Sequence, residues 1–180
     1  MVYVLFDNGF EEIEALSACD ILRRGGVEVK SVSVSTQPVV GAHQIPVTTD
    51  LMLSEVDPEQ MEMVVIPGGW DGVMNLLANE GALSLVQRAW DDGKYTAAIC
   101  AGPMVLAKLH ITDGKRATCY PGLEKELGSA VMQDADAVQD GRVITGRAPG
   151  AAIPFALKLV EVLKGTAAAA TVAEGLVWKK

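Results

Sequence analysis

The stretch YTAAICAGP, residues 95–103, decides the fold of this chain. Its apolar run from Tyr95 to Ile99 predicts a buried strand, and a helix is expected to begin just beyond it, from Gly102 to Leu109. Cys100 lies at the junction, with isoleucine and alanine beside it and glycine next. Small neighbours are what a tight turn from strand into helix requires, because the backbone there is crowded and strained. The stretch therefore predicts one strand–helix unit of a layered fold.

The same alternation of strand and helix continues on both sides of this unit. Short apolar runs predict strands, whereas apolar residues spaced three or four apart predict amphipathic helices. Residues 38–49 and 138–145 are typical of hairpins. Alternation with glycines at strand ends predicts an α/β fold with a doubly wound, mostly parallel sheet between helices. The further strands are expected at residues 2–6, 27–34, 63–66 and 117–119, and the further helices at 11–24, 82–91, 151–163 and 166–177.

The helix at residues 11–24 has a regular apolar pattern. Ile13, Leu16, Cys19 and Leu22 follow one another at helical spacing, and Gly25-Gly26 is expected to end the helix. This recurrence of apolar residues predicts an amphipathic helix, to whose apolar side these residues are expected to contribute.

Length and composition indicate one compact domain over residues 1–180. Hydrophobic residues make up 49% and charged residues 21%, which excludes intrinsic disorder because this much apolar surface offsets the entropy lost on ordering. Aromatic residues are only 5%, while glycine reaches 18 residues. A core of small aliphatic side chains fits close-packed α/β layers better than a β-sandwich, which usually has aromatic anchors.

The charge distribution argues against several classes of partner. Fifteen basic residues against 23 acidic ones give a net charge of −8, and no stretch concentrates Lys and Arg. Nucleic acids and anionic membrane surfaces are therefore not expected as partners. The longest apolar runs are shorter than the roughly 20 residues of a membrane span. Residues 1–6 also lack the basic start of a signal peptide, so a cytoplasmic protein is expected.

Cys100 is the candidate nucleophile. A helix N-terminus behind its sulfur supplies backbone amides and a partial positive charge, which favour the thiolate and lower the pKa of the thiol. The alternative is a small buried apolar side chain, a common fate of free cysteine. The position and the small neighbours favour the nucleophile. Cys19 and Cys119 add no disulfide framework or metal-type spacing, so neither a metal nor a cofactor is expected.

Glu14 is the candidate carboxyl partner. It follows the first strand and, in a doubly wound sheet, lies at the same edge as Cys100. Being one turn further into the helix, it is expected to be more buried than Glu11 or Glu12. A buried carboxyl is easily protonated, and a neutral one donates a hydrogen bond to a thiolate and moves protons. The alternative, stabilisation of the helix dipole by acidic residues in the first turn, stays open.

Gly68 and Gly69 follow the strand predicted at residues 63–66. Paired glycines at a strand end let the backbone approach a ligand and point amides at developing negative charge, although a plain turn is the alternative. No Gly-Lys-Ser/Thr follows, so this is not a phosphate loop. His110 is expected to cap a helix and His43 to be exposed in a hairpin loop, so a Cys–His protease dyad has no local support.

Together these motifs resemble the ThiJ/PfpI superfamily, and within it the DJ-1-like branch of deglycases and glyoxalases. The resemblance covers nearly the whole chain. It implies a flavodoxin-like sandwich (class I glutamine amidotransferase-like), Cys100 as the reactive cysteine and Glu14 as its carboxyl partner. It also implies an oxyanion pocket of backbone amides around Gly68, Gly69 and Ala101. The matching motifs are EEIE at residues 11–14, PGG at 67–69, AICAGP at 98–103, RAPG at 147–150 and VEVL at 160–163.

The chain departs from the family pattern at two positions. Tyr120 replaces the histidine that glyoxalase-active relatives carry before a proline, and its hydroxyl is expected to hydrogen-bond the substrate. Ala101 replaces the histidine that directly follows the cysteine in protease-type members. The resemblance therefore favours a deglycase or glyoxalase over a peptidase.

A homodimer is also implied by the resemblance. The helix at residues 11–24, with Cys19, Leu22 and Arg23-Arg24, is expected at the twofold interface, the commonest geometry of oligomers. Arg24, His43 and Pro149 are expected at the mouth of the Cys100 pocket on the side of the dimer.

These expectations lead to a cofactor-independent cysteine enzyme as the first hypothesis. The Cys100 thiolate attacks a 2-oxoaldehyde such as methylglyoxal, or its adduct on an amine of a glycated protein. Glu14 then moves a proton between neighbouring carbons, and hydrolysis releases a 2-hydroxy acid. The second hypothesis is a redox sensor or holdase chaperone in which Cys100 is oxidised to a sulfinate. Hydration of small electrophiles such as isocyanides is a less favoured third alternative.

Overall fold

The computed structural model describes residues 1–179 and contains a central seven-stranded sheet. The strand order is β10-β11-β7-β6-β1-β2-β5, and every neighbouring pair is parallel except β10–β11. This is the doubly wound α/β sheet that the sequence predicts. The strands are β1 (Val2–Phe6), β2 (Val29–Ser33), β5 (Leu51–Met52), β6 (Met63–Ile66), β7 (Tyr95–Ile99), β10 (Ala137–Asp140) and β11 (Val143–Gly146).

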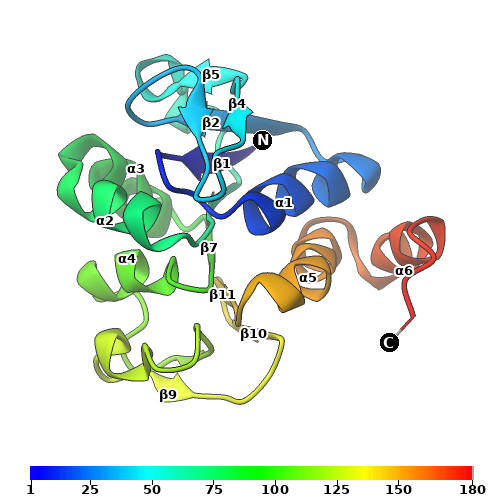
Figure 1. The fold of residues 1–180 in the computed structure, drawn as a ribbon. Helices are drawn as coiled ribbons and strands as arrows, with labels where there is room; N and C mark the ends of the chain where they lie inside the picture. Colours follow the sequence, from blue (N-terminus) through cyan, green and yellow to red (C-terminus); the bar gives the residue numbers. More distant parts are fainter. Residues whose placement is uncertain (180) are drawn as a thin grey trace.

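Helices cover both faces of this sheet (Figure 1). One face carries α1 (Glu12–Arg24), α5 (Ala152–Lys164) and α6 (Thr166–Gly175). The other carries α2 (Trp70–Ala78), α3 (Glu80–Asp91) and α4 (Pro103–Lys108). Alternate side chains of β1 enter the two layers, because successive residues of a strand point to opposite faces. Val2, Val4 and Phe6 join the first layer, whereas Tyr3 and Leu5 join the second.

Two small sheets and four 3-10 turns complete the described part of the chain, residues 1–179. The antiparallel pair β3 (Val39–Val40) and β4 (Pro46–Val47) confirms the predicted hairpin, although it forms a sheet of its own and does not extend the central one. The segment expected as a strand at 117–119 contributes β8 (Arg116–Ala117), which pairs with β9 (Val131–Met132). The 3-10 turns are Leu53–Glu55, Pro58–Gln60, Glu124–Leu127 and Pro149–Ala151.

Helix α2, like the short strands β5 and β9, is an element that sequence patterning did not predict. It begins directly at the end of the PGG turn, and Gly69 at its N-cap offers no side chain to mark the start. It also contains Gly72, which helix propensity disfavours. A β-carbon at Gly72 would lie 2.8 Å from the backbone nitrogen of Phe10, so close packing against the first loop requires the glycine.

The buried face of α1 differs from the one that the apolar spacing predicts. Ile13 is 57% exposed and Leu16 is 39% exposed, whereas Cys19 and Leu22 are buried as expected. The buried apolar residues of the helix are Ala15, Ala18, Cys19, Ile21 and Leu22, which pack against the sheet and α5. Each step of three residues turns by about 300° around a helix, so Ile13 lies on the side opposite Leu22 and faces outward.

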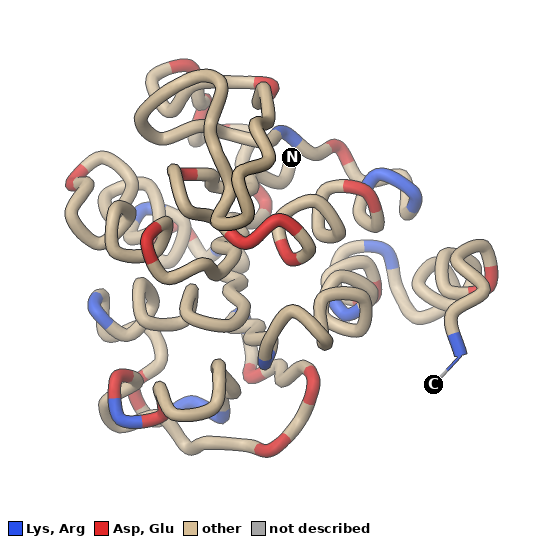
Figure 2. Tube along the Cα trace, in the orientation of Figure 1, with Lys and Arg blue, Asp and Glu red and all other residues tan. Residues whose placement is uncertain are grey.

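Charged residues are distributed unevenly along the molecule. Lys and Arg are scattered in Figure 2, whereas acidic residues concentrate where α1 begins. Glu11, Glu12 and Glu14 account for that concentration, and all three side chains are buried. Within residues 1–179, no helix is long and apolar enough to cross a membrane.

Candidate active site

Cys100 lies at a strained turn between β7 and the start of α4. Its φ of 65° is in the left-handed region, which costs a residue with a β-carbon on the order of 1–3 kcal/mol. Two backbone bonds hold it there: Cys100 N–H donates to Gly146 O at 3.0 Å, and Tyr120 N–H donates to Cys100 O at 2.9 Å. A β-carbon at Gly102 would lie 2.5 Å from Ile66 O. The tight turn expected from the small neighbours is confirmed.

Gly68, at the end of β6, lies between Cys100 and Glu14. Its N–H donates to Glu14 Oε2 at 2.7 Å. A β-carbon here would lie 2.5 Å from Glu14 Oε2 and 2.6 Å from Cys100 Cβ. Only glycine therefore allows the carboxyl and the sulfur to approach from both sides.

Glu14 enters this site from the first turn of α1. It is 1% exposed, compared with 7% for Glu11 and 5% for Glu12, so the predicted order of burial is confirmed by a small margin. Glu11 caps the helix by accepting a hydrogen bond from Glu14 N–H at 2.7 Å. Glu14 Oε1 is buried and makes no hydrogen bond of ordinary geometry within the described residues. A buried carboxyl left partly unpaired is favoured in its neutral form.

The pKa values of Glu14 and Cys100 depend on each other. Burial raises the pKa of Glu14 to about 7, although the Gly68 amide and the Cys100 thiol oppose this shift. Burial also raises the pKa of the Cys100 thiol above its ordinary value, as does the negative charge of Glu14. The predicted lowering of the thiol pKa is therefore wrong, because desolvation and a like charge outweigh the nearby amides. Because ionisation of one group makes ionisation of the other less favourable, the two groups titrate as a coupled pair.

Two backbone amides act in the opposite direction at the sulfur. The N–H groups of Gly69 and Ala101 interact with Cys100 and lower the pKa of its thiol. Gly69 has a φ of 90°, and a β-carbon on it would collide with the carbonyl of Gly9. The backbone around Gly69 can therefore lie this close only because it carries no side chain.

A pocket of about 440 Å³ opens over Cys100. Tyr120, whose side chain is 47% exposed, borders this pocket, as do His43 and Pro149. Trp70 is a pocket residue that sequence reasoning did not single out; the signal was its place directly after the PGG turn. The other lining residues are Glu11, Ala42, Gly69, Ala101, Pro121, Gly122 and Leu123.

Arg24 does not line the pocket of its own chain, and its expected place on the dimer side of a pocket stays a prediction. It is the last residue of α1, about 18 Å along the helix from the acidic first turn. Its guanidinium pairs with Asp20 at 2.8 Å on the surface.

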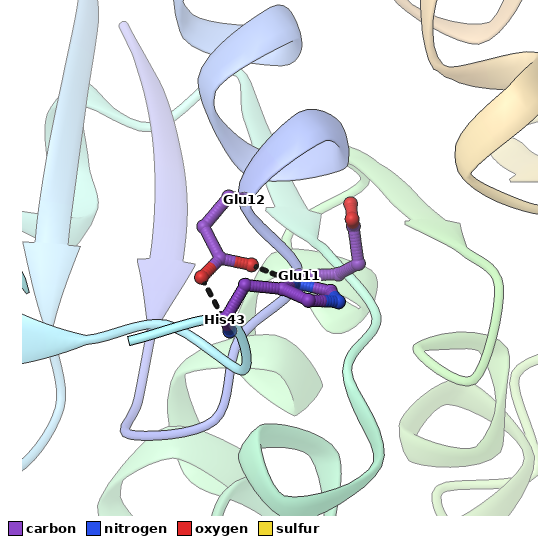
Figure 3. A group of neighbouring side chains, drawn as sticks. All are labelled: Glu11, Glu12 and His43. Atoms are coloured by element: carbon purple, nitrogen blue, oxygen red, sulfur yellow. Dashed lines mark hydrogen bonds and ion pairs between the residues drawn. The ribbon is translucent and has the colours of Figure 1, made fainter. Parts of the chain in front are cut away.

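Glu11, Glu12 and His43 form a compact group at the pocket mouth (Figure 3). Their potential ligand atoms lie within 4.8 Å of one another. Glu12, however, already accepts from His43 N–H at 2.6 Å and meets His43 Nδ1 at 2.8 Å. Burial raises the pKa of Glu12, but these bonds lower it to a net value below the ordinary one. The group fastens the hairpin loop onto α1, and a metal ion would have to displace these contacts.

The remaining cysteines lie elsewhere in the core. Burial raises the pKa of Cys19 to about 12 and that of Cys119 to about 11. Neither side chain lines the pocket over Cys100. His110, expected as a helix cap, lies just beyond α4 and contacts Asp113 at 3.1 Å on the surface.

Comparisons with known proteins agree with this arrangement. A model of the DJ-1/PfpI family matches residues 1–162. The chain is 35% identical over 176 residues to protein dj-1beta of Drosophila melanogaster, covering 96% of this chain and 94% of that protein. It is 31% identical over 165 residues to a deglycase of Pyrococcus abyssi, covering 91% and 99%. The solved structure of oxidized Toxoplasma gondii DJ-1 superposes with a TM-score of 0.94 at 32% identity, covering 99% and 98% of the two chains.

Proposed function

The chain belongs to the DJ-1/PfpI family, and from this membership we propose an enzyme of the deglycase or glyoxalase type. Cys100 is its nucleophile, and its substrates are 2-oxoaldehydes or the adducts that they form with protein amines. The observation that carries the proposal is the buried Cys100–Glu14 pair, whose side chains approach each other across Gly68 and whose ionisation is coupled.

The first step is formation and attack of the thiolate. When the thiol proton of Cys100 has moved to Glu14, the Cys100 thiolate adds to the aldehyde carbon and forms a carbon–sulfur bond. The aldehyde oxygen then carries the negative charge, and the amides of Gly69 and Ala101 are suitably placed to stabilise it. Glu14 supplies the proton that neutralises this oxygen, giving a hemithioacetal.

The second step moves hydrogen between adjacent carbons. Glu14 removes the proton from the former aldehyde carbon and a proton is returned to the neighbouring ketone carbon, which yields a 2-hydroxy thioester. Water then cleaves the carbon–sulfur bond, releasing a 2-hydroxy acid and the free thiol. A pKa of about 7 suits Glu14 to both roles, because a group near the working pH accepts and donates protons readily.

Turnover by purified protein tests this proposal. We expect methylglyoxal and water to give lactate with no added cofactor. We also expect the methylglyoxal adducts of N-acetyl-cysteine and N-acetyl-lysine to be converted back to unmodified N-acetyl-cysteine and N-acetyl-lysine. Lactate is measured enzymatically. Absence of both reactions in a correctly folded preparation would contradict the proposal.

A redox role is the second candidate, and the same amides favour it. Peroxide converts a thiolate first to a sulfenate and then, with a second peroxide, to a sulfinate, releasing one water at each step. The amides of Gly69 and Ala101 can stabilise the added oxygens, and a protonated Glu14 can donate to one of them. The related Toxoplasma gondii protein has been solved in an oxidized form. Mass spectrometry after limiting peroxide is expected to find two oxygen atoms on Cys100 before Cys19 or Cys119 reacts.

We further propose a homodimer built on the outer face of α1. Cys19 and Leu22 are buried within their own chain, so the exposed apolar side chains that α1 offers to a partner are Ile13 and Leu16. Light scattering at micromolar concentration is expected to give twice the mass of one chain. Leu16→Lys should shift the mass towards the monomer, whereas Val177→Lys, an exposed position near the C-terminus, should not. A monomeric parent protein would contradict the proposal.

A further inference from the structure

The pocket over Cys100 is larger than a three-carbon dicarbonyl requires. At about 30 Å³ per water molecule, its volume of about 440 Å³ holds roughly 15 waters. Methylglyoxal has five heavy atoms and would displace only a few of them. Pockets of several hundred Å³ are typical of ligands that bury most of their own surface. The volume beyond the reacting atoms therefore has room for a substituent.

The walls around that volume are predominantly apolar. Trp70, Leu123 and Pro149 border it, together with Ala42 and Pro121. Trp70 is 55% exposed in the chain. A ligand that covers its ring would remove apolar surface from water, which is favourable. Trp70 directly follows Gly69, whose amide faces the sulfur, so one turn places both the reacting centre and an aromatic wall.

Charge at the pocket argues against an anionic substituent. Within the described residues, no Lys or Arg lines the pocket, and Glu11 contributes a carboxylate. The imidazole of His43 is already paired with Glu12 at 2.8 Å. Within a single chain, a phosphate or carboxylate on the substituent would therefore face the Glu11 carboxylate and an apolar wall, with no Lys or Arg beside it in the described residues.

We propose that this pocket selects 2-oxoaldehydes that carry an apolar, ring-sized substituent held against Trp70, Leu123 and Pro149. This inference rests on the proposed function and names the substrate class of that site. The carbonyl end lies at Cys100 and the amides, and the substituent extends along the apolar wall. Phenylglyoxal represents the preferred class, and dicarbonyls with phosphate or carboxylate groups represent the disfavoured one.

Steady-state kinetics on a substrate series gives the first test. From methylglyoxal through ethylglyoxal to n-butylglyoxal, kcat/KM is expected to rise about fourfold for each buried methylene, and phenylglyoxal should exceed methylglyoxal by at least tenfold. Trp70→Ala should reduce the phenylglyoxal-to-methylglyoxal ratio about tenfold, while Trp70→Phe should retain most of it. Trp178→Ala, a tryptophan outside the pocket, is the matched control and should keep the parent ratio.

Alkylation of Cys100 tests the apolar wall without requiring turnover. The thiolate displaces iodide from iodoacetamide and from N-benzyl iodoacetamide, and mass spectrometry gives both rates. Relative to the ratio for glutathione, Cys100 should favour the benzyl reagent at least tenfold in the parent protein and much less in Trp70→Ala.

The outcomes separate this inference from the proposed function. If the parent protein turns over no 2-oxoaldehyde but its Cys100 still prefers the benzyl reagent, the enzymatic proposal is overturned and the apolar wall is supported. A flat substrate series together with no benzyl preference would overturn the inference while methylglyoxal turnover still stands. A preference that survives in Trp70→Ala would overturn the assignment of the wall.

Discussion

Cys100 and Cys119 are both buried thiols that border a pocket and lie near a carboxylate, but their backbone conformations and hydrogen-bond partners differ. Cys119 is 4% exposed in a small apolar cluster with Ala117 and Leu127, and its thiol donates to the carbonyl of Tyr120 at 3.5 Å. Cys100 is 7% exposed and has a left-handed backbone, a carboxyl partner, two amides and a pocket. Burial raises the thiol pKa at both sites. A reactive site therefore comes from the groups that exchange a proton and stabilise charge, and burial alone does not provide one.

Removing each sulfur in turn should produce the largest contrast. Cys100→Ser is expected to lower kcat/KM for methylglyoxal by at least about 1,000-fold, because a hydroxyl at this site is a much weaker nucleophile than a thiolate. Cys119→Ser should stay within about threefold of the parent. Lactate formation measures both variants. Similar losses of kcat/KM in the two variants would contradict the assignment of Cys100, and not Cys119, as the nucleophile.

The carboxyl partner should have the next largest effect. Glu14→Gln keeps a hydrogen-bond donor but exchanges no proton, so we expect kcat to fall about 100-fold or more, within the usual range for general acid–base catalysis. Glu11→Gln, which retains an oxygen that can cap the helix, should cause a much smaller loss. Equal losses would mean that the acidic turn acts only through helix stability.

Glu14 should also make stability depend on pH. Its pKa is about 7 in the folded chain, so the folded state holds this proton more tightly than the unfolded state does. The contribution is present at low pH and is lost as the pH rises from about 4.5 through 7, an effect of about 3 kcal/mol in the free energy of unfolding. Urea unfolding at several pH values measures it. If the unfolding free energy of Glu14→Gln depends on pH as steeply as that of the parent protein, the dependence belongs to another group.

Gly68→Ala tests the close approach of the two groups. The new β-carbon would collide with Glu14 and Cys100, so we expect a loss of 1–3 kcal/mol in unfolding free energy and about 10-fold to 100-fold in activity. Gly175→Ala, where no atom lies within 4 Å of the new carbon, is the control and should change neither quantity appreciably. Full activity in Gly68→Ala would contradict the geometry inferred for the pair.

Tyr120 connects the two regions and should give the smallest effect. Its side chain borders the Cys100 pocket, while its carbonyl contacts Cys119. Tyr120→Phe removes one hydrogen bond, about 0.5–1.5 kcal/mol, and should lower methylglyoxal turnover about two- to tenfold. Tyr120→His should raise turnover if the absence of an imidazole at this position limits catalysis. A thousandfold loss in Tyr120→Phe would show that the phenol is an essential acid or base.

Most of the longer strands and helices followed from sequence alone, because apolar periodicity and turn residues act over a few neighbouring positions. The position of Cys100 between β7 and α4 followed in the same way, as did the resemblance carried by the PGG and AICAGP motifs. Helix α2 was missed because its start carries no capping side chain.

Only the tertiary structure decided how these elements use their side chains. It turned Ile13 outward, left Arg24 far from the pocket and brought Trp70 to it. It also raised the pKa of Cys100 where the local sequence suggested a lower one. These outcomes depend on desolvation and on charges from segments distant in the chain, and local patterns contain no measure of either. Glu14 and Cys100 are 86 positions apart in the sequence, and packing around Gly68 makes them one chemical unit.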